Sequence, residues 1–88
     1  MNEVRLYSIY DVDMSVFAPP FLARSDDEAK AMVRDAIAEG SVLHRFPTHY
    51  HLYFCGTFDD KHGFVDTSLV CLCSINDLIY RLKEADHE

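Results

Sequence analysis

The chain has 88 residues, of which 49% are apolar, 26% charged and 12% aromatic, so it has the length of one small domain and too much apolar content for a disordered chain. Lysine and arginine number 8 against 15 aspartates and glutamates, and the formal net charge is −7. This balance excludes a strongly basic coat for nucleic acid or for an anionic membrane surface.

The first predicted element is a strand over residues 3–11, where β-branched and aromatic residues suit a pleated sheet. The next residues, Asp11-Val12-Asp13, predict a turn, because aspartate side chains accept hydrogen bonds from nearby backbone. Residues 15–22 predict a second extended segment. Pro19 and Pro20 lack the N–H group that a sheet needs, so we expect this segment at a sheet edge or as an irregular run.

A helix is predicted to start at Ser25, whose hydroxyl can cap it, and Glu28 completes a capping box. Acidic residues in the first turn suit the positive end of the helix dipole. The apolar residues that follow recur at helical spacing and form one narrow stripe: Ala29, Met32, Val33, Ala36 and Ile37. Gly40 is expected to end the helix, because glycine tolerates the left-handed conformation common at helix ends.

Residues 41–47 are a predicted connection, and residues 49–58 are the next predicted strand. Strict alternation places two sets of side chains on its two faces: Tyr50, Leu52, Phe54 and Phe58 on one, and His49, His51, Tyr53 and Cys55 on the other. Residues 59–63 predict a hairpin turn, and residues 64–73 predict the returning strand. Ser74 and Asp77 predict a second capping box and a last helix.

These elements follow the order β-β-α-β-β-α within a single domain, residues 1–88. Paired strands separated by a helix favour an α+β fold with a four-stranded, mainly antiparallel sheet and two helices packed on one face. Aromatic and apolar residues on both faces of residues 49–58 indicate that the second face is also covered. A homodimer would cover it, so we expect a homodimer.

The chain has no apolar run of 18 residues, so no membrane span is expected, and its first residues lack the basic and apolar pattern of a signal peptide. Its cysteines are Cys55, Cys71 and Cys73, an odd number. Cys71 and Cys73 are two positions apart, which predicts both side chains on one strand face. We therefore expect a reducing cytosol and no disulfide framework.

Histidine and cysteine residues form a potential zinc set. His49 and His51 are predicted on one strand face, with Cys71 and Cys73 on the neighbouring strand and His44 and His62 in the flanking segments. The tight spacing of a zinc motif, such as Cys-x₂-Cys, is absent. A half-exposed face with histidines and small apolar thiols is favoured instead, so no metal or other cofactor is expected.

A catalytic pair is weakly indicated by Cys55 with His49 or His51. A nucleophilic cysteine needs an electropositive pocket to lower the pKa of its thiol, and no such residues surround Cys55 in the sequence. Neither a glycine-rich phosphate loop nor a nucleophile elbow is present. We therefore expect that the protein is not an enzyme.

Single-stranded DNA is bound by aromatic stacking combined with a basic groove. The candidate stacking residues are Tyr7, Tyr10 and Tyr53, and the candidate phosphate-binding residues are Arg5, Arg45 and Lys61. Residues 41–62 are the least acidic part of the chain. The alternative is that these aromatic residues belong to the core and rim of the sheet, and the net charge of −7 favours that alternative.

Short segments occur in an order that resembles a known family. They are Tyr7-Ser8-Ile9-Tyr10-Asp11, Phe17-Ala18-Pro19-Pro20-Phe21, Asp26-Asp27-Glu28-Ala29, Pro47, and residues 52–59 followed by Gly63. Together with the chain length, they resemble the small nonstructural protein of gokushoviruses, tailless microviruses with circular single-stranded DNA genomes. The positions that match are Tyr7, Tyr10, Pro20, Phe21, Tyr53, Gly56, Phe58, Asp59 and Gly63.

The resemblance implies a nonstructural phage protein made in the cytoplasm of an infected bacterium. It also implies a role in replication of the viral single-stranded DNA or in delivery of the genome to packaging, through DNA binding. No catalytic residues transfer from the family.

A second hypothesis is a protein-interaction module that contacts the viral replication initiator, the capsid or a host factor. The net charge of −7 fits this hypothesis better than DNA binding. Salt distinguishes the two, because DNA binding weakens steeply with salt and an apolar protein contact does not.

Overall fold

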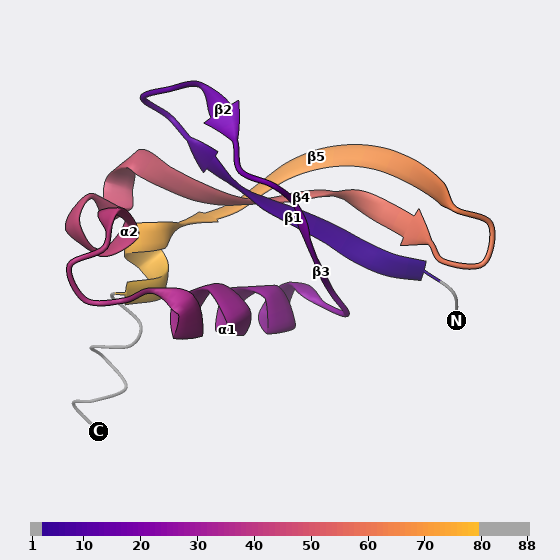
Figure 1. Ribbon diagram of the computed structural model, residues 1–88, viewed down its shortest axis with the longest axis horizontal. Helices are drawn as coiled ribbons and strands as arrows, with labels where there is room; N and C mark the ends of the chain where they lie inside the picture. The colour runs from indigo at the N-terminus through magenta and orange to yellow at the C-terminus, as the bar shows by residue number, and fades with distance from the viewer. Residues whose placement is uncertain (1–2, 80–88) are drawn as a thin grey trace.

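An antiparallel sheet forms the centre of the computed structural model, which describes residues 3–79 (Figure 1). Its strands are β1 (Glu3–Asp11), β2 (Val16–Phe17), β3 (Phe21–Ala23), β4 (Tyr50–Asp59) and β5 (Phe64–Ser74). The strand order is β2-β1-β4-β5, and β3 also pairs with β1. The helical elements are α1 (Asp26–Ala36), α2 (Val42–Arg45), the 3₁₀ turn η1 (Pro47–His49) and residues 75–79. The predicted α+β class is confirmed.

The second predicted strand is divided into two short strands on the free edge of β1. In β2, Phe17 pairs with Tyr10, and in β3, Phe21 pairs with Tyr7. The break falls at the two prolines, which cannot donate to β1. Just before them, the backbone of Ala18 remains bound to β1, because its N–H donates to the Ile9 carbonyl at 2.8 Å and its carbonyl accepts from Ser8 Oγ at 2.6 Å.

The predicted start of α1 is confirmed, and its predicted end is wrong. Ser25 Oγ accepts a hydrogen bond from the Glu28 N–H at 3.1 Å, while the Glu28 carboxylate accepts one from the Arg24 N–H at 3.1 Å. The helix ends at Ala36, because Ile37 adopts an extended conformation that lets its side chain pack against the core. Gly40 takes a φ of 84° in the later turn that leads into α2.

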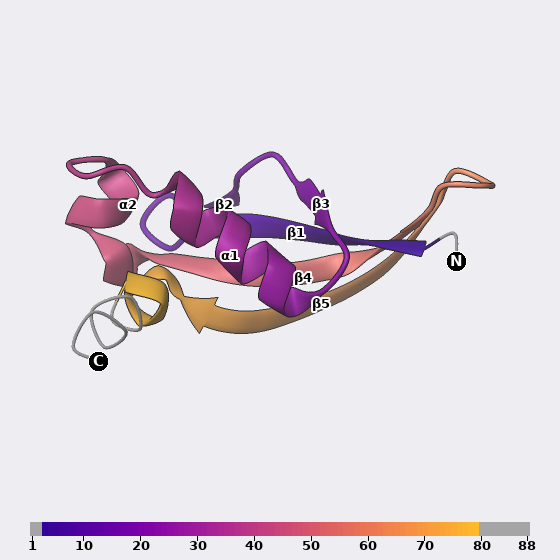
Figure 2. The same cartoon turned by 90° about the horizontal axis from the view of Figure 1, so that it is seen from below.

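The core lies between one face of the sheet and the helices. Figures 1 and 2 show α1 and residues 75–79 on the same side of the sheet, with α1 lying across β1 and β4. The buried apolar residues come from β1, β3, β4, α1 and the helical residues 75–79: Tyr7, Ala23, Ala29, Val33, Leu52, Ile75 and Leu78. The second capping box is also present, since the Asp77 N–H donates to Ser74 Oγ at 3.2 Å and the Ser74 N–H to Asp77 Oδ2 at 3.1 Å.

An irregularity in β4 moves one aromatic residue to the other face of the sheet. Tyr7 pairs with Phe54, but the residue before Tyr7 in β1, Leu6, pairs with Gly56. Cys55 is therefore an inserted residue in β4 relative to β1. Beyond this bulge, Phe58 pairs with Val4 and therefore lies on the face opposite Phe54. The prediction that Phe58 shares a face with Leu52 and Phe54 is wrong, because strict alternation does not continue through a bulge.

A second irregularity separates the two C-terminal cysteines. Leu52 pairs with Cys73 and the adjacent Tyr53 pairs with Cys71, which leaves Leu72 inserted in β5. Cys73 packs against the core, whereas Cys71 is exposed. The prediction that Cys71 and Cys73 share one strand face is therefore wrong, and the same bulge mechanism explains the error.

Candidate nucleic-acid interface

The face of the sheet opposite α1, here called the outer face, carries no carboxylate in the strands that the structure describes. The pairing register assigns Tyr7, Ile9, Leu52 and Phe54 to the helix side. It assigns these side chains to the outer face: Val4, Leu6, Ser8, Tyr10, Phe17, Leu22, His51, Tyr53, Phe58, Val65, Thr67 and Cys71. The charge of −7 therefore resides on the helix side, in the turns and at the ends of the chain.

Three aromatic rings meet on this face and form the outer-face cluster, Tyr10, Phe17 and Tyr53. The ring centroids of Tyr10 and Phe17 are 4.6 Å apart, those of Phe17 and Tyr53 are 5.3 Å apart, and those of Tyr10 and Tyr53 are 5.7 Å apart. Phe17 is 43% exposed, and both tyrosines are half-buried. Partial desolvation, followed by contact with Cys71, raises the pKa of Tyr53 above its usual value.

Arg45 lies beside this end of the sheet, in a second exposed ring group. Its guanidinium carbon is 5.3 Å from the centroid of Phe46, and Phe46 stacks on His49 with centroids 5.6 Å apart. His49 Nδ1 lies 2.6 Å from Asp13 Oδ2, and the His49 carbonyl accepts from the Val12 N–H at 3.0 Å. These contacts attach η1 to the β1–β2 turn, so α2, which carries Arg45, and β2, which carries Phe17, lie at the same end of the molecule (Figure 1).

Tyr7 and Arg5 belong to the helix side. Tyr7 has 0% exposure, so its ring cannot stack on a base, and its predicted role is corrected to that of a core residue. Its hydroxyl donates to Asp26 Oδ1 at 2.6 Å and accepts from Arg5 Nε at 2.8 Å, while Arg5 Nη2 donates to the same Asp26 oxygen at 2.9 Å. The guanidinium of Arg5 also lies 4.1 Å from the centroid of the Phe54 ring.

Burial and the hydrogen bonds among Arg5, Tyr7 and Asp26 shift the pKa values of all three groups. The hydrogen bond from Tyr7, helped by Arg5, lowers the pKa of Asp26, and burial raises the pKa of Tyr7. Tyr7 also raises the pKa of Arg5, first of all through its hydrogen bond. The charge of Arg5 is thus already balanced by Asp26, and its contacts join β1 to the start of α1.

Lys61 lies at the far end of the molecule from the outer-face cluster, in the turn between β4 and β5 (Figure 1). This turn is organised by Asp59, which accepts from the Lys61 N–H at 3.0 Å and lies 2.8 Å from His62 Nδ1. Hydrogen bonding from His62 and from the backbone lowers the pKa of Asp59. Of the six predicted binding residues, the structure brings Tyr10 and Tyr53 into ring contact and places Arg45 on α2 at the same end of the molecule. It separates Arg5, Tyr7 and Lys61 from them.

Phe17 is the member of the cluster that is not among the predicted binding residues. A hairpin through the predicted turn at Asp11-Val12-Asp13 would have placed Phe17 near Tyr10, so a signal for this contact was present in the sequence.

The histidines and cysteines do not form a metal site within residues 3–79, since no three groups of metal-ligating type lie close enough together there. Cys71 is exposed, and Cys55 and Cys73 are half-buried. Burial raises the pKa of the Cys55 thiol, which is the opposite of what a nucleophilic cysteine needs. None of the helices in this part of the chain is long and apolar enough to span a bilayer.

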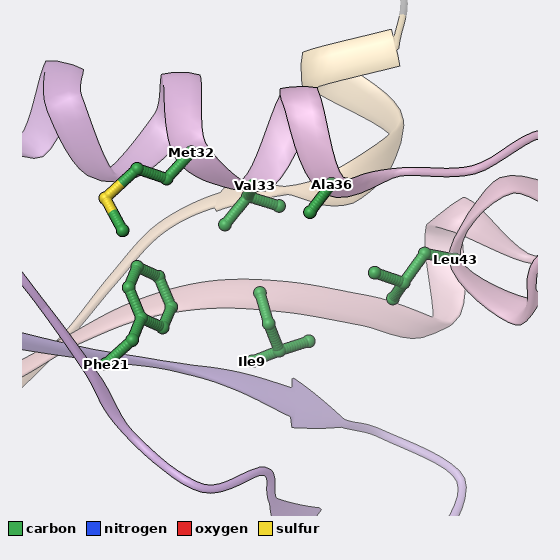
Figure 3. Close-up of a pocket in the computed structure, with 6 residues that line it drawn as sticks. All are labelled: Ile9, Phe21, Met32, Val33, Ala36 and Leu43. Atoms are coloured by element: carbon green, nitrogen blue, oxygen red, sulfur yellow. The ribbon is translucent and has the colours of Figure 1, made fainter.

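An apolar groove lies between α1, α2 and the sheet (Figure 3). It has a volume of about 270 Å³ and is lined by Ile9, Phe21, Met32, Val33, Ala36 and Leu43. A second hollow of about 270 Å³ shares Ile9 and Leu43 and continues to Val16 and Tyr50. No polar side chain lines the first hollow, whereas specific small-molecule sites place a few polar groups among apolar ones.

Comparison with known proteins assigns the chain to a family. No curated protein and no solved structure is significantly similar to it. The family model of the phage ORF5 protein matches residues 4–78, which include every strand of the sheet except the first residue of β1. The chain belongs to the phage ORF5 protein family.

Proposed function

We propose that this phage protein is a non-enzymatic nonstructural protein that binds single-stranded DNA through the outer-face cluster. Its role in the cytoplasm of the infected bacterium is support of viral single-stranded DNA replication or delivery of the genome to packaging. Family membership supports the phage origin. The resemblance to the small nonstructural protein of gokushoviruses supports the single-stranded DNA genome and the replication role.

The observation that carries the proposal is the outer-face cluster on a sheet face without carboxylates. Nucleobases stack on aromatic side chains presented by a sheet, and each such contact contributes roughly 1–3 kcal/mol. Phe17 offers the most accessible ring, at 43% exposure, and Tyr10 and Tyr53 support it from β1 and β4. His51 pairs with Tyr10 and adds a polar donor to the same face.

Charge limits the affinity and makes it sensitive to salt. The acidic first turn of α1, Asp26 to Glu28, lies on the helix side, so phosphates that follow the outer face avoid it. Arg45 is exposed at the same end of the molecule as the cluster, and we assign it one phosphate contact, which gives a salt slope near −0.7 for single strands. We therefore expect weak binding that depends more on stacking than on phosphate contacts.

The test is fluorescence anisotropy of a labelled single-stranded oligonucleotide at low and at physiological salt, with duplex DNA for comparison. Phe17→Ala and Tyr53→Ala are expected to weaken binding about 5- to 150-fold, which corresponds to the loss of one stacked base. The matched control is Phe64→Ala, because Phe64 is 70% exposed at the other end of the sheet. Arg45→Ala should weaken binding and flatten the salt dependence, whereas Lys61→Ala should do neither.

Two results would contradict the proposal. One is the absence of saturable binding at low salt by protein whose circular dichroism shows the native fold. The other is equal affinity of Phe17→Ala and Phe64→Ala for the single strand.

A protein-interaction module is the second candidate. The net charge of −7 and the exposed apolar side chains of β5, including Val65 and Leu69, favour it. Its partner would be the viral replication initiator, the capsid or a host factor. Capture of one such protein from infected cells, unchanged between low and physiological salt, would support this candidate over DNA binding.

A further inference from the structure

The two edges of the sheet differ in whether a further strand could pair with them. At one edge, β1 is covered by β2 and β3. At the other edge, β5 pairs with β4, and no other strand within residues 3–79 pairs with its second side. At about 3.3 Å per residue, its eleven residues span roughly 36 Å, most of the 44 Å long axis of the molecule.

Apart from its bulges and one aspartate, β5 lacks the features that keep an edge strand from pairing. Residues 64–71 are exposed without interruption, and the strand contains no proline, lysine or arginine. Its one charged residue is Asp66. Four exposed apolar side chains lie along it: Phe64 at 70%, Leu69 at 61%, Val65 at 55% and Val70 at 47% exposure. The bulges at Leu72 and around residues 68 and 69 bend the strand without adding charge to its edge.

We propose that β5 pairs antiparallel with β5 of a second copy of this chain, so that one sheet continues across a two-fold axis. With Asp66 as its one charge, the edge selects neither a basic partner nor phosphate, and a partner strand must instead be apolar and nearly uncharged. β5 of another copy has that composition and the matching length, and an antiparallel pair of identical strands closes on itself. The proposal does not depend on DNA binding.

Charge also favours this edge as the contact between two acidic chains. Each copy carries a net charge of −7, so the contact must fall where carboxylates are few. A standard interface takes about 800 Å² from each partner, roughly an eighth of the 6102 Å² accessible surface of the chain. The eight consecutive exposed residues of β5 and the adjoining outer-face side chains are the surface that the pairing would bury, and the two outer faces would become continuous.

The test compares two lysine variants by sedimentation equilibrium in the absence of DNA. Leu69→Lys places a cation on the proposed junction, where it faces its own copy, and Val42→Lys places one on α2, where Val42 is 54% exposed. Both variants lower the magnitude of the net charge from 7 to 6, so general repulsion falls equally in both. We expect wild type and Val42→Lys at about twice 10.1 kDa, and a dimer dissociation constant raised at least tenfold in Leu69→Lys.

Hydrogen exchange of the unaltered protein gives a second measurement that no folding defect can affect. Amide exchange in β5 should slow as protein concentration rises, whereas exchange in β2 should not change. A monomeric wild type at all concentrations, or equal dimerisation of Leu69→Lys and Val42→Lys, would overturn the proposal. Failure of DNA binding is a separate outcome, because Phe17→Ala should lose DNA affinity and keep the dimer.

Discussion

The hydroxyl group of Tyr7 joins the first strand to the first helix. It is the only part of this buried side chain that is polar, and both of its partners, Arg5 and Asp26, are charged. A hydrogen bond to a charged group stabilises a fold more than one between neutral groups. The Tyr7 ring in turn packs against Phe21 and Phe54, with centroids 5.8 and 5.7 Å away. The residue therefore serves the core and the β1–α1 junction together.

Tyr7→Phe removes this hydroxyl and keeps the ring. We expect the free energy of unfolding to fall by about 1–2 kcal/mol, because the partly exposed Asp26 and Arg5 recover some of the lost interaction from water. Tyr10→Phe makes the same change on the outer face and should cost less than about 0.5 kcal/mol. Urea unfolding of wild type and both variants measures these losses. If Tyr7→Phe lost no more stability than Tyr10→Phe, the contacts of the Tyr7 hydroxyl with Asp26 and Arg5 would not stabilise the fold.

The carboxylate of Asp26 should make stability depend on acid. Its pKa is lowered in the folded protein by Tyr7 and Arg5, so the unfolded chain binds the proton more tightly. The stabilisation is therefore present above the unfolded pKa, near 4, and is lost as pH falls through the lower folded pKa. In Asp26→Asn, the decline in thermal stability below about pH 4 should be shallower than in wild type. Asp27→Asn, at an exposed site in the same turn, should follow the wild-type profile.

At the residue scale, the sequence identified aromatic side chains but not their faces. Tyr7 and Tyr10 are three positions apart, so strand alternation places them on opposite faces of the sheet. Alternation does not say which of the two faces the helices cover. That depends on where α1 packs, which is a tertiary property. As a result, a core residue and an outer-face residue were predicted to share one role.

At the scale of elements, the bulge in β4 depends on Gly56. Its φ of 143° is one that residues with a side chain rarely adopt, and an added Cβ would collide with the carbonyl oxygen of Asp66 in β5. The close approach lets β4 and β5 remain paired while their register shifts between Phe54 and Gly56. The same glycine therefore sets the position of Phe58 on the outer face.

Gly56→Ala should destabilise the protein by about 3 kcal/mol, from backbone strain and from the collision with β5. Gly63→Ala is the matched control, because Gly63 also has a positive φ, 74°, but has open space around it. It should cost only about 1 kcal/mol. Thermal unfolding separates the two outcomes. Equal losses would mean that the approach of β5 to Gly56 is not a constraint.

The starts of helices were predictable from sequence, and the bulges were not. Ser25 and Ser74 cap their helices through contacts within four residues, so the pattern of nearby side chains carries the information. α1 ends at Ala36 because Ile37 turns towards the core, which no local pattern encodes. The bulges at Cys55 and Leu72 depend on cross-strand register and reverse the faces of Phe58 and Cys71.

At the scale of the whole molecule, net charge is a poor guide to the outer face. The sequence gives −7, but the register leaves the outward positions of the described strands without a carboxylate. Acids are concentrated in the first turn of α1 and in the turns, where they accept backbone hydrogen bonds, as Asp11 and Asp59 do. A single charge for the chain therefore cannot decide between DNA and protein as the partner of this face.

On the helix side of the molecule, the groove between α1, α2 and β1 leaves apolar side chains incompletely packed. Ala36 lines it opposite Ile9 and Leu43, as Figure 3 shows. Because alanine leaves this space unfilled, a larger apolar side chain on the same helix should gain burial without strain. Ala36→Leu is therefore expected to raise the free energy of unfolding by about 1 kcal/mol.

Ala36→Gln tests whether that gain comes from filling the groove. Glutamine has a helix propensity close to that of leucine, but it would place a polar amide among Ile9, Met32 and Leu43. Urea unfolding should rank Ala36→Leu above wild type and wild type above Ala36→Gln. If both variants were less stable than wild type, the groove would have to close in solution around Ala36, since a leucine fitted into open apolar space adds buried area and removes none.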